Sequence, residues 1–244
     1  FAGAVYCSRA TRELCEIMLP DSGHLQEEEA RYANHAGYAK HHPALPLYTR
    51  IDAEHALRSL KPVDMEHTIA LDRDVAFRLS RAGHILGAAM VLLSAGGRTI
   101  VFSGDLGRPD DPIMRAPAAI ERADYLVVES TYGDRLHDRE DTAGVIGEIL
   151  NRTFARGGAV IMPAFAVGRA QVLLYHIARL KAAGKIPMSV PVYLNSPMAV
   201  DATRIFQRHH GEHRLSAEQC DATCRDVQIV NSVEESEALN RRSG

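Results

Sequence analysis

The stretch TIVFSGDLGRPDDPIM (Thr99–Met114) decides the fold class of this chain. Its β-branched, apolar beginning predicts a buried strand, and the Gly and Pro residues that follow predict a loop. Asp105 lies where the strand passes into that loop. Because a strand end holds a side chain rigidly, this carboxylate is well placed to bind a cation.

Two further polar residues occupy the same kind of position. His84 in RAGHILGAA and Glu129 in VVESTYGDR each follow an apolar run and precede a glycine. Taken singly, each of the three has a simpler explanation: a hydrogen-bonded turn histidine, an Asx turn at Asp105, and a carboxylate that caps a turn. Their recurrence at three strand exits favours one common site, since imidazole and carboxylate are ligands for hard and borderline cations.

The first part of the chain has mainly the periodicity of strands. An opening strand leads to a helix that Ser8 is expected to cap and Pro20 to stop. Residues 22–41 then have helical spacing, and a short helix follows from Asp52. From Thr68 onward apolar residues alternate with polar ones, and Ala95-Gly96-Gly97 predicts a hairpin. With a further buried strand in ADYLVVES (residues 123–130), this part predicts an antiparallel or mixed sheet.

The remainder alternates helices with strands. Helices are predicted at residues 142–158, 168–184, 198–210 and 232–240, and strands at 159–165, 190–196 and 227–231. This alternation predicts a parallel, doubly wound sheet. The change of pattern divides the chain into predicted domains 1–140 and 141–244.

Composition excludes several classes of protein. With 28 basic and 31 acidic residues, the net charge of −3 gives no overall attraction to nucleic acid or to an anionic membrane. No apolar run is long enough to span a membrane, so no membrane partner is expected. The four cysteines show neither a disulfide framework nor zinc-finger spacing, which favours a cytoplasmic location.

Five segments of the chain carry a family resemblance. They are, in order, RAGHILGAAMVLL, IVFSGDLGRPDDPIM, ADYLVVESTYGDRLH, GGAVIMPAFAVGRAQVLLYHI and VYLNSPMA. They resemble the β-CASP family of metallo-β-lactamase-fold RNA nucleases. The resemblance implies an α/β fold, with an incomplete metallo-β-lactamase αββα sandwich followed by an incomplete, doubly wound α/β β-CASP domain.

The resemblance also implies an activity and the residues that serve it. Zinc-dependent hydrolysis of RNA phosphodiester bonds is expected, with two zinc ions as cofactors and RNA as partner; a homodimer is left open. In such enzymes the residue at His84 binds one zinc ion, that at Asp105 bridges both, and that at Glu129 assists proton transfer or orients a histidine. Arg169 and Ser196 are expected to contact phosphate, whereas Asn195 stands where the family more often has aspartate.

The chain also departs from the family pattern. The His-x-His-x-Asp-His cluster and the late histidine motifs of the family do not occur in it, and it runs from Phe1 to Gly244. We therefore expect an internal fragment of a longer protein, with weak or no metal binding and no activity of its own. Two alternatives remain: a non-catalytic RNA-binding paralogue, and a metallo-hydrolase acting on a small ester.

Overall fold

The chain has a mixed α/β structure that divides into two compact units. The computed structural model describes residues 3–136 and 141–242. The first unit comprises Phe1–Arg81, Gly87–Gly104 and Ala118–Val127, and the second comprises Ala82–Leu86, Asp105–Pro117 and Val128–Gly244. The predicted domain boundary falls at residues 137–140, outside the described residues. The division into domains 1–140 and 141–244 therefore stays a prediction.

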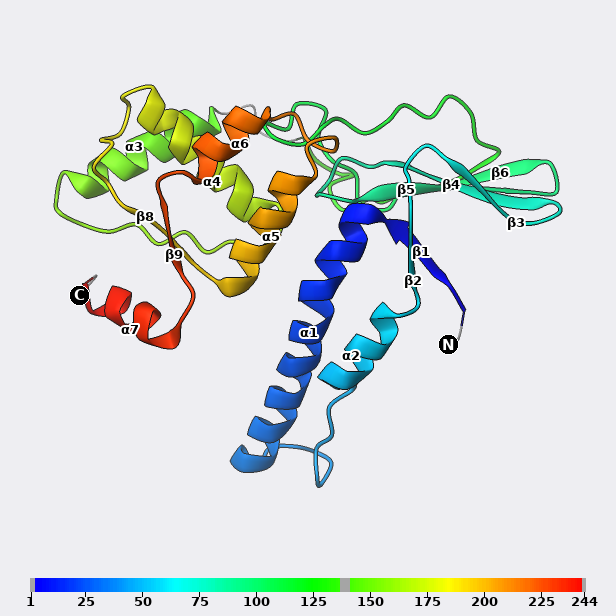
Figure 1. The fold of residues 1–244 in the computed structure, drawn as a ribbon, viewed down its shortest axis with the longest axis horizontal. Helices are drawn as coiled ribbons and strands as arrows, with labels where there is room; N and C mark the ends of the chain where they lie inside the picture. The colour runs from blue at the N-terminus through cyan, green and yellow to red at the C-terminus, as the bar shows by residue number, and fades with distance from the viewer. Residues whose placement is uncertain (1–2, 137–140, 243–244) are drawn as a thin grey trace. The chain divides into compact units, whose positions relative to one another are not determined.

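A five-stranded mixed sheet organises the first unit (Figure 1). All neighbouring strands are antiparallel except the last pair, which is parallel. Alternation in sequence becomes alternation in burial: Phe77 and Leu79 are buried on one face of the sheet, and Met90 and Leu92 are buried on the other. The predicted mixed sheet is confirmed. In order, its strands are β3 (Thr68–Asp72), β4 (Val75–Arg81), β5 (Ala89–Ala95), β6 (Arg98–Phe102) and β7 (Tyr125–Val127).

The prediction that β7 is buried is wrong. Its residues are exposed, Leu126 by 63%. Among the described residues β7 pairs only with β6, so it forms an edge of the sheet. The apolar run correctly indicated a strand, but composition could not tell on which faces that strand is covered.

The helical stretches predicted on either side of Pro20 form one continuous helix. Ser8 does cap it, since its hydroxyl accepts the Thr11 N–H at 3.1 Å, but α1 (Arg9–Ala36) continues through Pro20. A Cβ on Gly23 would lie 2.7 Å from the backbone of Arg50, so α1 packs closely on α2 (Arg50–Leu57). Tertiary packing of this kind outweighs the local cost of an internal proline.

A second, small sheet was missed in the first unit. It pairs β1 (Val5–Ser8) in parallel with β2 (Leu60–Val63). The strand at Leu60–Val63 was not predicted, and it contains Pro62, which donates no ladder hydrogen bond. A strand with one partner has an open edge that tolerates this loss.

The second unit combines helices with a two-stranded sheet. Leu150, Leu180 and Ile186 form its apolar core. The predicted parallel pairing is confirmed for β8 and β9. The prediction of a strand at 159–165 is wrong, since these residues form neither helix nor strand, and Pro163 within them cannot donate to a ladder. The elements are α3 (Thr142–Phe154), α4 (Arg169–Ala182), β8 (Val192–Asn195), α5 (Pro197–Arg208), α6 (Ala217–Cys224, not predicted), β9 (Val227–Val230) and α7 (Val233–Arg242).

Candidate active site at the strand ends

The three residues singled out at strand exits all lie in the second unit. His84 follows β4, Asp105 follows β6 and Glu129 follows β7. Nε2 of His84 lies 3.9 Å from Oδ2 of Asp105. Both side chains are open to solvent, 46% and 75% exposed respectively. An imidazole nitrogen and a carboxylate oxygen therefore face a common, accessible point.

Two glycines bring the loops of His84 and Asp105 together. Gly107 donates its N–H to the carbonyl of Ala82 at 2.9 Å. A Cβ on Gly107 would lie only 1.8 Å from the carbonyl oxygen of Gly83, so the two loops touch backbone to backbone. Gly83 itself has φ 69°, a left-handed conformation that favours glycine. Glycine at these two positions thus makes the close approach of His84 and Asp105 sterically allowed.

Glu129 acts on the loop that carries Asp105. Its Oε1 accepts the backbone N–H of Leu106 at 2.8 Å. This bond, a side-chain hydrogen bond from Thr131 and the charge of His84 all lower the pKa of the Glu129 carboxyl. An ionised Glu129 is therefore bonded to the residue next to Asp105, a position that suits orientation of the loop.

The donor types fit a divalent metal, but their number is small. Catalytic zinc sites usually take three protein ligands from histidine and acidic side chains. Within residues 3–136 and 141–242, no third His, Cys, Asp or Glu joins His84 and Asp105 in a compact ligand group. The described residues therefore offer two of the ligand groups that such a site would use.

Arg169 and Ser196 are the two residues expected to contact phosphate. Arg169 is exposed at the start of α4, and the preceding Gly168 packs so closely on Ile85 that a Cβ would lie 2.9 Å from it. Ser196 caps α5 by accepting the Ala199 N–H at 3.2 Å. In the described part of the chain, neither Arg169 nor Ser196 is hydrogen-bonded to the three strand-end residues. Asn195 donates its Nδ2–H to Oγ of Ser236 at 2.9 Å.

Sequence reasoning missed a tether on the Asp105 loop. Arg214 donates its backbone N–H to Ile113 O at 2.8 Å and its Nε–H to Met114 O at 2.7 Å. Arg115 donates in return to the carbonyl of His213 at 2.9 Å. These partners lie about a hundred positions apart, so no local signal in the sequence could have revealed them.

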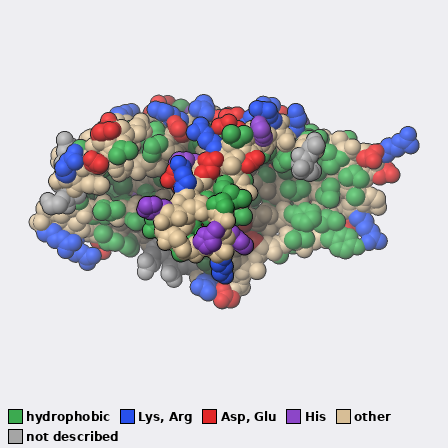
Figure 2. Space-filling model, turned by 90° about the horizontal axis from the view of Figure 1, so that it is seen from below, with side chains coloured by type: hydrophobic (Ala, Val, Ile, Leu, Met, Phe, Trp, Pro, Cys, Tyr) green, Lys and Arg blue, Asp and Glu red, His purple; other side chains and the backbone are tan. Residues whose placement is uncertain are grey.

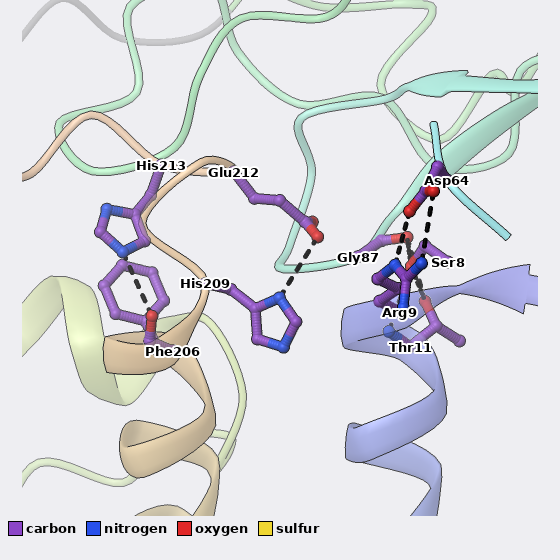
Figure 3. A network of polar contacts seen from close by, with 9 residues as sticks. All are labelled: Ser8, Arg9, Thr11, Asp64, Gly87, Phe206, His209, Glu212 and His213. Atoms are coloured by element: carbon purple, nitrogen blue, oxygen red, sulfur yellow. Dashed lines mark hydrogen bonds and ion pairs between the residues drawn. The ribbon is translucent and has the colours of Figure 1, made fainter. Parts of the chain in front are cut away.

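A second group of possible metal ligands comprises His210, His213 and Cys220, whose ligand atoms lie within 4.8 Å of one another. Nδ1 of His213 accepts the Leu215 N–H at 3.2 Å, so Nε2 carries the proton and donates to Phe206 O at 3.2 Å (Figure 3). Burial raises the pKa of the Cys220 thiol to about 11. Both ring nitrogens of His213 are thus hydrogen-bonded, and the Cys220 thiol is protonated at neutral pH. The group is therefore a hydrogen-bonded part of the core rather than a prepared metal site.

Acid sensitivity offers a test of this interpretation. Burial, above all, lowers the pKa of His213, which is fully buried. Below about pH 6.5 the His213 side chain is protonated in the unfolded chain but stays neutral in the folded chain. The free energy of unfolding therefore falls as the pH drops below about 6.5. We expect His213→Gln to cost about 1–3 kcal/mol at pH 7.5 through lost bonds. Urea unfolding should then show a smaller further loss at pH 5.5 than in the wild type.

The matched control is His24→Gln, at an exposed position of α1. It should leave the pH dependence of the wild type intact. An unchanged pH dependence in the His213→Gln variant would contradict a buried, neutral His213.

Comparison with known proteins places the chain in a family. The Beta-Casp domain matches residues 170–244. The chain is 33% identical to a ribonuclease of Thermus thermophilus, with all of this chain aligned to 53% of that protein. It is 28% identical to cleavage and polyadenylation specificity factor subunit 3-I of Arabidopsis thaliana, over 86% of this chain and 28% of that protein. It is 31% identical to an endoribonuclease of Schizosaccharomyces pombe, over 86% of this chain and 26% of that protein.

The chain thus spans about half of the bacterial relative and about a quarter of the two eukaryotic ones. The domain match covers the part that contains α4 to α7, and the alignments extend over the strand-end loops as well. Together with the five sequence segments, these findings give one assignment. The chain belongs to the β-CASP family of metallo-β-lactamase RNA nucleases.

Proposed function

We propose that this chain supplies His84 and Asp105 to the metal centre of a zinc-dependent enzyme that hydrolyses RNA phosphodiester bonds. The observation that carries the proposal is the 3.9 Å separation of the His84 and Asp105 ligand atoms, in a chain whose relatives are named as ribonucleases. The incomplete metallo-β-lactamase sandwich implied by the sequence is part of the same proposal.

The two residues suit different parts of such a centre. His84 offers an imidazole nitrogen, which carries no charge when it binds a metal. Asp105 offers two oxygens on a short side chain, which suits a bridge between two cations. Divalent ions bound there would supply an activated water and would neutralise charge on the phosphate. Such ions could not lie close together without an anionic bridge, which is the role we assign to Asp105.

We assign Glu129 to positioning. Its bond to the Leu106 N–H orients the loop next to Asp105, and the same bond lowers the pKa of the Glu129 carboxyl, which favours its ionised, accepting form. Arg169 is exposed and has a guanidinium that could bind phosphate through two hydrogen bonds. The hydroxyl of Ser196 can still donate while its oxygen caps α5. Contacts of Arg169 and Ser196 with the RNA backbone are therefore part of the proposal.

The surface charge fits a local mode of RNA binding. On the face displayed in Figure 2, Lys and Arg side chains are interspersed with Asp and Glu, and the net charge is −3. Attraction for RNA must then come from bound cations and from individual residues such as Arg169. No described helix is both long and apolar enough to cross a membrane. A cytoplasmic location remains a prediction of the sequence, and nothing in the structure or the comparisons supports a homodimer.

The proposal is tested by RNA cleavage with the whole protein and with the 244-residue chain. End-labelled RNA is incubated with each, with added zinc and after chelation. We expect zinc-dependent cleavage by the whole protein, and little or none by the 244-residue chain, because two ligands rarely hold zinc tightly. RNA binding without cleavage by the whole protein would favour a non-catalytic paralogue. Equal cleavage by the whole protein and the 244-residue chain would show that the chain holds more metal ligands than His84 and Asp105.

A further inference from the structure

A cavity lies between the last turns of α4 and α6, within the second unit. Its volume is about 540 Å³, which is in the range of small-molecule sites. Tyr175 and Lys181 line it from α4, Thr223 from α6, and Met188 from the loop after α4. None of the strand-end residues contributes to its wall, so the proposed active site does not account for it.

Among the charged side chains that line the cavity, cations outnumber anions. Arg179, Lys181 and Arg225 line it together with one carboxylate, that of Asp226. Lys181 is only 5% exposed, and within the described residues the single acceptor of its Nζ is Met188 O at 3.4 Å. In the part of the chain that the structure describes, Lys181 forms no ion pair. A buried ammonium with one long hydrogen bond is costly unless an anion joins it.

Helix capping does not explain the buried ammonium. Basic residues in a last turn often bond to free carbonyls or offset the helix dipole. The carbonyls of Arg179, Leu180 and Lys181, however, already accept backbone N–H groups from Ala183, Lys185 and Gly184, each at 2.9 Å. The helix dipole accounts for the exposed Arg179 but gives no reason to bury the ammonium group of Lys181.

The remaining walls fit a nucleotide. The guanidinium carbon of Arg179 lies 5.6 Å from the centre of the Tyr175 ring, so an aromatic face and a cation are adjacent. We propose that this cavity binds one nucleotide, with its phosphate at Lys181 and Arg225 and its base against Tyr175. Asp226 is available to accept a hydrogen bond from a ribose hydroxyl. The nucleotide is either free or the end of an RNA strand, and only the RNA source rests on the proposed function.

The test is calorimetric titration of the 244-residue chain, without metal, with three probes: inorganic phosphate, AMP, and a short RNA with or without a 5′-phosphate. We expect AMP to bind more tightly than phosphate alone. Lys181→Met should weaken AMP binding by about 10-fold or more, because the methionine keeps the length and loses the charge. Arg225→Gln, at an exposed position, should weaken it in the same direction. Should Lys181→Met fail to fold, Arg225→Gln decides the test.

Lys185→Met is the matched control, since it removes a lysine from the same region that does not line the cavity. It should leave the affinity for AMP within about twofold. Binding of RNA that depends on its terminal phosphate identifies the strand end as the source, whereas AMP binding alone identifies a free nucleotide. No binding of any probe up to about 5 mM, or equal binding by both cavity variants and the wild type, overturns the proposal. Because metal and cleavage are absent from this test, its result is independent of the nuclease proposal.

Discussion

Gly107→Ala is expected to separate the His84 loop from the Asp105 loop and to destabilise the fold. The new Cβ would lie 1.8 Å from Gly83 O and 2.7 Å from the His84 N atom, so backbone must move. Movement of the Gly107 backbone would also break its N–H bond to Ala82 O. Overpacking and a lost hydrogen bond together should lower the free energy of unfolding by about 2–4 kcal/mol. This is a large share of the about 5–15 kcal/mol typical of a domain.

The same variant should also weaken metal binding. In other enzymes, a displacement of about 1 Å between catalytic groups lowers the reaction rate about 100-fold. We expect Nε2 of His84 to move by a comparable amount relative to Asp105. The measurements are urea unfolding of the 244-residue chain and zinc content of the purified whole protein. Gly211→Ala is the control, because Gly211 lies in the same unit, has open space around its Cβ position and has no positive φ. Similar losses in both variants would refute a special contact at Gly107.

Asp105→Ala in the whole protein is expected to abolish RNA cleavage. Even residues that only support a metal ligand change affinity or activity by about 10–100-fold, so loss of the bridging carboxylate should lower kcat by more than about 100-fold. Zinc content should fall in parallel. Because the side chain of Asp105 is 75% exposed, the free energy of unfolding without metal should change little.

Asp110→Ala is the matched control for that experiment. Asp110 is an exposed acid of the same loop, and the structure records no hydrogen bond or ion pair for it. The control variant should keep the cleavage rate and zinc content of the wild type. If Asp105→Ala retained near-normal turnover, Asp105 would not be the metal bridge.

The positions of His84, Asp105 and Glu129 were predictable because strand periodicity is a local property. Apolar alternation located β4 to β6, and the polar residue after each run was visible without any coordinates. The continuity of α1 was not predictable in this way. Helical spacing was visible on both sides of Pro20, but the joining of the two stretches is favoured by the packing of α2 at Gly23. Local preference is overridden wherever distant segments pack on one another.

By itself, the sequence determined which chemical groups stand at the ends of which strands, the mixed α/β class and the family. Only the tertiary structure decided that His84 and Asp105 approach to 3.9 Å, that Arg214 bonds to the loop after Asp105, and that Lys181 is buried with no ion pair among the described residues. The reason is physical. Side-chain type and periodicity can be determined from neighbouring residues. The distance between two loops, in contrast, depends on how backbone segments twenty to a hundred residues apart pack on one another, as at Gly83 and Gly107.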